Sequence, residues 1–191
     1  MGLVVRSLDD LPETSDREYF VYLLDYGWHE PLDQALKDNF DKIATSVSSH
    51  KGVVIRRSVE GVHFNDEVLS WHHINGEDVE KKNLLPAILI TNRHPRIFKE
   101  LADKHNQYFD TRDLSLILIP LKKFCKTTTD VVNALIKISK DIREKKDLED
   151  FKVVKELKPG IGRAIVKGIV LEPKIAGMGF SFNKMIEALR K

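Results

Sequence analysis

Apolar runs with the length of strands alternate along this chain with segments of helical periodicity, and this alternation constrains the fold more than any other feature. The runs are rich in β-branched and aromatic residues, as buried strands are. They are Tyr19–Leu24, Val53–Ile55, Pro86–Thr91 and Leu114–Ile119. With the helical segments included, the order is strand, helix, strand, helix, strand, strand, helix. This order predicts an α/β protein with a central sheet flanked by helices.

Three segments carry apolar residues at helical spacing, which places those residues on one face of a helix. The faces are Leu32, Leu36, Phe40, Ile43 and Val47; Phe64, Val68 and Trp71; and Val131, Leu135, Ile138 and Ile142. Pro31 suits the start of the first helix, and Thr127–Asp130 resembles a capping box before the third. Asn65 is predicted to cap the second helix.

The chain of 191 residues has the length of one large domain with a small appendage. Residues 1–17 are predicted to form an acidic, weakly ordered arm, residues 18–145 the α/β domain, and residues 146–191 a basic C-terminal extension. Residues 151–191 contain nine Lys or Arg and three Asp or Glu, a net charge of +6, against +2 for the whole chain. Within the extension, Ala164–Leu171 is predicted to be a strand and Asn183–Arg190 a helix.

Cys125 is the single cysteine, so the chain cannot form an internal disulfide. This usage is typical of a reducing compartment. The first residues contain no long apolar run, which argues against a signal peptide or a membrane span. We therefore expect a cytoplasmic protein without a membrane partner.

Three local features resemble the thioredoxin fold. A buried strand ends in Asp25-Tyr26-Gly27-Trp28, and a long amphipathic helix follows it. Leu85–Ile90 is similar to the family's third strand, which begins at a cis proline. The resemblance covers residues 18–145 and implies a cis peptide bond before Pro86. The alternative is a doubly wound, flavodoxin-like parallel sheet, in which Ile97–His105 would be a crossover helix between parallel strands.

The chain departs from the thioredoxin pattern at the redox motif. The family carries Cys-x-x-Cys where its first helix starts, whereas this chain reads Gly27-Trp28-His29-Glu30-Pro31. Disulfide exchange requires a thiolate, so this chemistry is excluded at that position. The leading prediction is a non-redox, thioredoxin-like module that binds or regulates a protein partner and needs no cofactor.

Candidate residues for binding a protein lie in loops that the thioredoxin arrangement would bring to one end of the sheet. Trp28 and His29 follow the carboxyl end of a strand, where α/β proteins often bind ligands. The other candidates in these loops are Trp71, His72, His73 and Pro86.

Clustered histidines suggest a hydrolase or nuclease as an alternative. His63, His72, His73 and His94 have several carboxylates near them in the sequence. However, adjacent side chains on a helix diverge by about 100°, so His72 and His73 cannot both face one ion. No HxxxH or HExxH pattern occurs. We therefore predict no metal site and name no catalytic residue.

The string Leu157-Lys158-Pro159-Gly160-Ile161-Gly162-Arg163-Ala164 resembles the hairpin of helix-hairpin-helix DNA-binding motifs. In those motifs, hairpin amides contact the phosphate backbone without reading the sequence. The candidate nucleic-acid-binding residues are Lys158, Gly160, Gly162, Arg163 and Lys167. A plain Pro-Gly turn between strands is the simpler interpretation of the string, because Ala164–Leu171 favours a strand. A nucleic acid is therefore the alternative partner.

Overall fold

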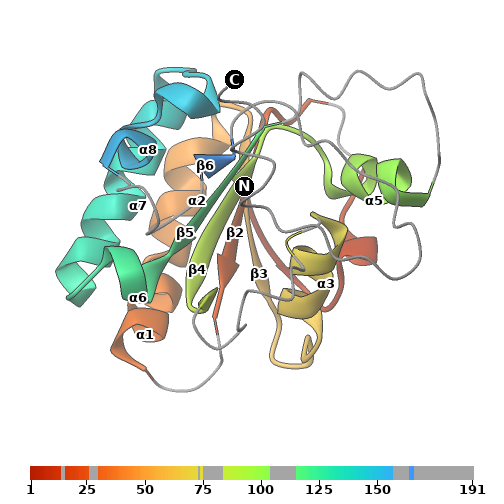
Figure 1. Ribbon diagram of the computed structural model, residues 1–191, viewed down its shortest axis with the longest axis horizontal. Coiled ribbons are helices and arrows are strands. Elements are labelled where there is room, and N and C mark those ends of the chain that lie inside the picture. The colour runs from red at the N-terminus through yellow and green to blue at the C-terminus, as the bar shows by residue number, and fades with distance from the viewer. Residues whose placement is uncertain are drawn as a thin grey trace, which may run out of the picture.

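The computed structural model describes residues 1–13, 16–25, 30–72, 74, 84–103, 115–156 and 164–165. It is an α/β protein with one open, mixed sheet and helices on both faces (Figure 1). The strands lie in the order β1-β3-β2-β4-β5-β6. Their bounds are β1 Gly2–Val5, β2 Tyr19–Leu24, β3 Gly52–Arg57, β4 Ala87–Thr91, β5 Leu116–Pro120 and β6 Ala164–Ile165.

The helices form two layers. One layer holds α1 (Pro31–Asp38), α2 (Phe40–Ser48), α6 (Leu121–Phe124), α7 (Thr128–Arg143) and α8 (Lys152–Glu156). The other holds α3 (Phe64–Trp71) and α5 (Pro95–Asp103). The short 3-10 helices η1 (Leu8–Asp10) and η3 (Leu148–Asp150) complete the described elements. The α/β class and the flanked central sheet are as predicted.

The strand directions exclude one of the two predicted architectures. Strands β1 and β2 both pair with β3 in parallel, while β4 runs antiparallel to β2 and to β5. The doubly wound parallel sheet is therefore wrong. Because β4 and β5 are antiparallel, α5 between them is not a crossover helix between parallel strands. The Leu85–Pro86 peptide bond is cis.

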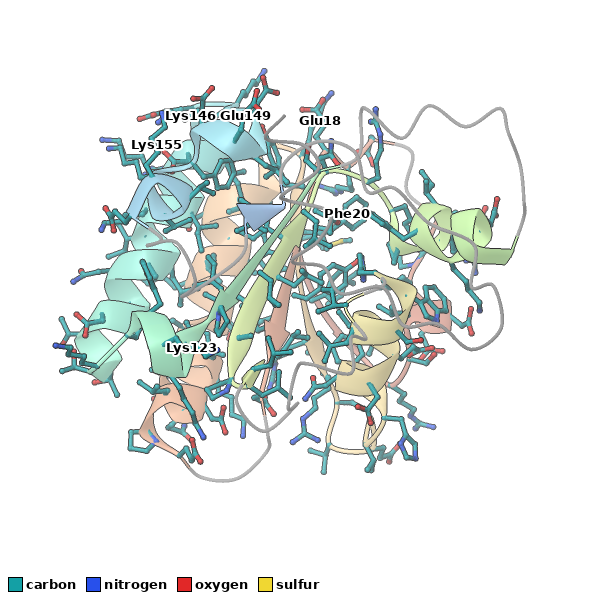
Figure 2. All side chains as sticks on the ribbon, viewed as in Figure 1. Glu18, Phe20, Lys123, Lys146, Glu149 and Lys155 are labelled. Carbon is teal, nitrogen blue, oxygen red and sulfur yellow. The ribbon has the colours of Figure 1, made fainter. Side chains whose placement is uncertain are left out.

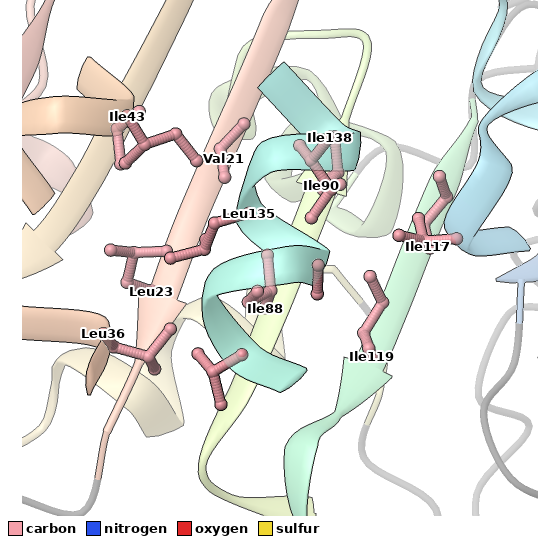
Figure 3. Close-up of a cluster of buried hydrophobic side chains, with 14 of the residues drawn as sticks. Val21, Leu23, Leu36, Ile43, Ile88, Ile90, Ile117, Ile119, Leu135 and Ile138 are labelled. Atoms are coloured by element: carbon pink, nitrogen blue, oxygen red, sulfur yellow. The ribbon is translucent and has the colours of Figure 1, made fainter. Parts of the chain in front are cut away.

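Strand β2 is buried on both faces, which explains its continuous apolar sequence. Tyr19, Val21 and Leu23 belong to the core under α1, α2 and α7, and Phe20, Tyr22 and Leu24 to the core under α3 and α5. Figure 3 shows the first core, in which Val21 and Leu23 lie near Leu36, Ile43, Leu135 and Ile138.

The predicted first helix is two helices, because the chain departs from helical geometry at Asn39 (φ −102°, ψ 3°). The Asn39 side-chain amide donates to the carbonyl of Ala35 at 2.9 Å. The apolar face nevertheless continues across this break, with Leu36, Phe40, Ile43 and Val47 all buried.

The predicted N-terminal arm is wrong for the described residues 1–13. Residues 2–5 form the edge strand β1, and Leu8 and Leu11 are buried. A Cβ at Gly2 would lie 2.9 Å from the Ala44 Cβ, so β1 packs closely against α2. The short apolar run Gly2–Val5 gives little signal beside the acidic residues that follow it in the sequence.

The core also passes the predicted boundary at residue 145. Leu148, Phe151 and Val153 are buried with the side chains of α7. The buried Asp141 carboxylate accepts from the Lys152 amide at 2.6 Å and from Lys146 Nζ at 2.7 Å. These contacts attach η3 and α8 to the domain.

The predicted helix caps had mixed outcomes. The capping box is confirmed, since the Thr127 hydroxyl and the Asp130 carboxylate each accept from the other residue's amide. The cap at Asn65 is wrong: His63 is the N-cap, and the Asn65 side-chain amide donates to the Asp25 carbonyl. Of the predicted strand Ala164–Leu171, residues 164–165 are described, as β6. The predicted helix Asn183–Arg190 lies outside the described residues.

Candidate functional site

The ends of five strands meet at one edge of the sheet, here called the carboxyl edge. The carboxyl ends of β1, β2, β3 and β5 lie there because these strands run in the same direction, and the start of antiparallel β4 joins them. In Figure 1 this is the lower end of the sheet, beside α1 and α6. Lys123 of α6 marks the same end in Figure 2. Ligands of open α/β sheets bind outside the carboxyl ends of strands.

A buried ion pair joins β2 to β3 at this edge. Arg57 Nε donates to the Asp25 carboxylate at 2.7 Å, and both side chains are largely shielded from water. The Asn65 amide of α3 donates to the backbone carbonyl of Asp25. The end of β2 is therefore tied to a neighbouring strand and to a helix.

Pro86 lies next to this ion pair, because Ala87 stands opposite Leu24 in the ladder between β4 and β2. Pro86 is buried, and its carbonyl accepts from the amide of Leu121 at 2.8 Å. On the surface nearby, Lys122 Nζ lies 3.0 Å from a Glu30 carboxylate oxygen. Pro86 therefore supports the edge from inside and offers no exposed surface.

Trp28 and His29 lie outside the described residues, as does His73. Their loop is flanked by Asp25 and Glu30, both of which stand at the carboxyl edge. The predicted role of Trp28, His29 and His73 in binding a partner therefore stays a prediction.

An open groove of about 570 Å³ lies at the carboxyl edge, between the segments that follow β1 and β3 and the helix α3. Its lining includes Arg6, Glu60, Val62, His63, Glu67 and Trp71. Glu67 fixes one wall, because its carboxylate accepts from the Ser7 hydroxyl and from the Leu8 amide, each at 2.8 Å. Arg6 and Glu60 form an exposed ion pair at 2.6 Å on the rim.

The segment after β3 exposes two apolar side chains beside this groove. Val59 is 95% exposed and Val62 is 74% exposed. Among the described residues, the other exposed large apolar side chains are Ile136 and Val4, at 50% and 49%. The sequence reasoning missed this segment, although two valines on either side of Glu60-Gly61, a turn-like pair, were a signal for it.

Trp71 lines this groove, whereas His72 does not. Trp71 packs in the second apolar core and lines the groove with the 9% of its surface that is exposed, and Lys99 Nζ lies 4.1 Å from its ring centroid. His72 is buried, and its ring packs against Tyr22 and Phe98, with centroids 5.3 Å and 4.6 Å away. Its Nδ1 lies 2.7 Å from the Val68 carbonyl, which can only accept, so Nδ1 carries the proton. His72 is therefore a core residue that offers a partner almost no surface.

Cys125 is buried, and burial raises the pKa of its thiol to about 11. The thiol therefore stays protonated at neutral pH and is a poor nucleophile. Burial also lowers the pKa of the His94 imidazole, whose ring stands edge-on to Phe20 at 5.5 Å. No group of three or more His, Cys, Asp or Glu in the described part of the chain could hold a metal ion.

The candidate nucleic-acid-binding residues Lys158, Gly160, Gly162, Arg163 and Lys167 lie outside the described residues. Within the described ranges, every helix is too short or too polar to cross a membrane.

The chain matches no protein-family model, no curated protein and no solved structure.

Proposed function

We propose that this chain is a non-redox, thioredoxin-like module that binds a partner protein at the carboxyl edge of its sheet. The partner contacts Val59 and Val62 and inserts side chains into the groove lined by Trp71. Trp28 and His29, which the sequence predicts to bind the partner, are included in this proposal.

The exposure of Val59 and Val62 beside the open groove carries this proposal. Protein interfaces combine an apolar centre with a polar rim, and here the rim is supplied by Arg6, Glu60 and His63. Small-molecule sites bury most of their ligand, which an open groove cannot do. The shape therefore favours a protein surface as the ligand.

The strand arrangement supports the thioredoxin-like part of the proposal. In the order β1-β3-β2-β4-β5, the first three strands are parallel to one another and the fourth is antiparallel to its neighbours. Helix α1 follows β2 and starts at Pro31 without a cysteine. Because Cys125 is buried with a raised pKa, the described cysteine does not supply the thiolate that redox activity would need.

Affinity purification with matched variants tests the proposal. The tagged wild-type chain is compared with a Val59→Ser/Val62→Ser variant and with Val4→Ser as the control. Val4 is half-exposed and pairs in register with Arg56. The Arg56 guanidinium stacks on Phe40 of α2, so Val4 lies on the face of the sheet that α2 covers. We expect the double variant to lose a discrete partner that Val4→Ser retains.

Identical partner profiles for all three proteins would refute the carboxyl edge as the binding surface. A Trp28→Ala variant extends the test to the adjoining loop. If Trp28→Ala keeps the partner that Val59→Ser/Val62→Ser loses, the loop does not contribute to binding.

A further inference from the structure

A second groove, of about 180 Å³, is lined by residues of α2 and α7. Ile43 of α2 and Leu135 of α7 form its floor, and both are buried side chains of the first core (Figure 3). Val132 and Ile136 line it along α7, and Ile136 is 50% exposed. The groove is therefore apolar at its base and open to solvent along two helices.

The charges around this groove have one sign. Lys42 of α2 and Arg143 of α7 line it, both exposed, and no carboxylate is among its lining residues. Neither cation has an ion-pair partner among the described residues. By contrast, three lysines on or just after α7 that do not line the groove are paired: Lys137 with Glu156, Lys140 with Glu144, and Lys146 with Asp141. The cations that face the groove are thus the ones left for an external anion.

The size and shape of the groove restrict its occupant. Its volume is below the roughly 300 Å³ at which drug-sized ligand sites begin, but it can hold an apolar anchor of a protein partner. A groove between two helices accepts the apolar stripe of a third helix, whose anchors recur every three or four residues. A second copy of this chain is disfavoured, because a symmetric contact would bring Lys42 and Arg143 of both copies together.

We propose that the α2–α7 groove is a docking site for an acidic amphipathic helix of a partner protein. The helix places a large apolar side chain against Ile43, Leu135 and Ile136, and its carboxylates pair with Lys42 and Arg143. This surface is separate from the carboxyl edge and does not depend on the function proposed there.

Synthetic helices test this docking site on the full chain. The acidic probe is a fluorescent, side-chain-stapled peptide of about 15 residues, because unstapled helices of that length are marginal in water. It has leucines at positions i, i+4, i+7 and i+11, and glutamates on both sides of this stripe. A basic probe has lysine at each glutamate position, and a third probe has serine at each leucine position. Binding is measured by fluorescence anisotropy at low and high salt.

The charge-reversed variant Lys42→Glu/Arg143→Glu provides the decisive comparison, since both residues are exposed and the change leaves the core intact. We expect the acidic probe to bind the wild type and to lose about tenfold in affinity on the variant, with salt weakening the wild-type complex. The basic probe should show the opposite preference. Ile136→Ser should weaken the acidic probe by about tenfold, and the serine probe should not bind.

Val62→Ser is the matched control, because it removes an exposed apolar side chain at the carboxyl edge, and it should leave binding of the acidic probe unchanged. Failure of the acidic probe to bind the wild type would overturn the docking site, as would equal binding of the acidic and basic probes. Concentration-dependent dimerisation that Ile136→Ser abolishes would assign the groove to a second copy and would also overturn it. None of these results bears on the carboxyl edge.

Discussion

The two grooves of this protein rest on different kinds of structure. The α2–α7 groove has Ile43 and Leu135 as its floor, and both continue into the first apolar core. At the carboxyl edge, polar contacts hold the segments in place: the Glu67 carboxylate accepts from the Ser7 hydroxyl and the Leu8 amide, and the Asp25 carboxylate accepts from Arg57. One surface is therefore maintained by packing and the other by carboxylates that accept hydrogen bonds and pair with a cation, so the two should respond differently to truncation, charge removal and acid.

Loss of the Asp25 carboxylate should have the largest effect. Asp25→Ala leaves the guanidinium of Arg57 largely buried without its anion, which should lower the free energy of unfolding by about 3–5 kcal/mol. Chemical denaturation measures this loss. The double variant Asp25→Ala/Arg57→Met should recover part of it, because no buried charge remains. A double variant as unstable as Asp25→Ala would show that the ion pair is not what holds this edge.

Truncation of the floor of the α2–α7 groove should come next. Leu135→Ala should cost about 2–4 kcal/mol, through lost apolar burial and the cavity left behind. The neighbouring Ile136→Ala should cost under about 1 kcal/mol, because half of that side chain is exposed. Denaturation curves of both variants measure these losses. Equal losses at the two positions would contradict the assignment of Leu135 to the buried floor of the groove and of Ile136 to its exposed side.

Neutralising Glu67 should have a smaller effect, directed at the N-terminal segment. Glu67→Gln weakens two charge-assisted hydrogen bonds to Ser7 and Leu8 and should cost about 1–2 kcal/mol. Hydrogen exchange should quicken at residues 7–11 and stay unchanged in α7. Equally faster exchange at residues 7–11 and in α7 would show that the N-terminal segment bound by Glu67 does not open separately from the rest of the domain.

The smallest effect should appear in acid, at the start of α7. Hydrogen bonds from the amides of Thr127 and Lys126 lower the pKa of the Asp130 carboxyl. A group with a depressed folded-state pKa stabilises the protein above its unfolded-state pKa, and this contribution is lost as the pH falls through the folded value. Asp130→Asn should therefore be less stable than wild type at neutral pH and approach it in acid. A stability difference that persists at low pH would contradict this origin.

Most of the fold could be predicted from the sequence where apolar periodicity was strong. Strands β2 to β5, the face from Leu36 to Val47 and the cap at Thr127 follow from spacing and residue type. Strand β1 was missed because four residues beside an acidic stretch carry little periodic signal, and its pairing with β3 depends on distant residues. The antiparallel direction of β4 likewise depends on tertiary packing.

The candidate site was less predictable, because exposure is a property of the folded chain. The sequence predicts His72 in a loop after the apolar face of α3, yet it is buried against Tyr22 and Phe98. Val59 and Val62 flank a turn-like pair in the sequence, but their exposure beside a groove is a property of the folded chain. Trp71 was found from its residue type and does line that groove.

Site-specific photo-crosslinking tests the proposed binding edge most directly. A photoreactive phenylalanine analogue replaces Val62 in one protein and Val4 in another, and both are irradiated in cells that express the chain. The account predicts a discrete crosslinked partner from position 62 that disappears when Val59→Ser is added, and no such product from position 4. The same products from both positions, or none from position 62, would contradict it.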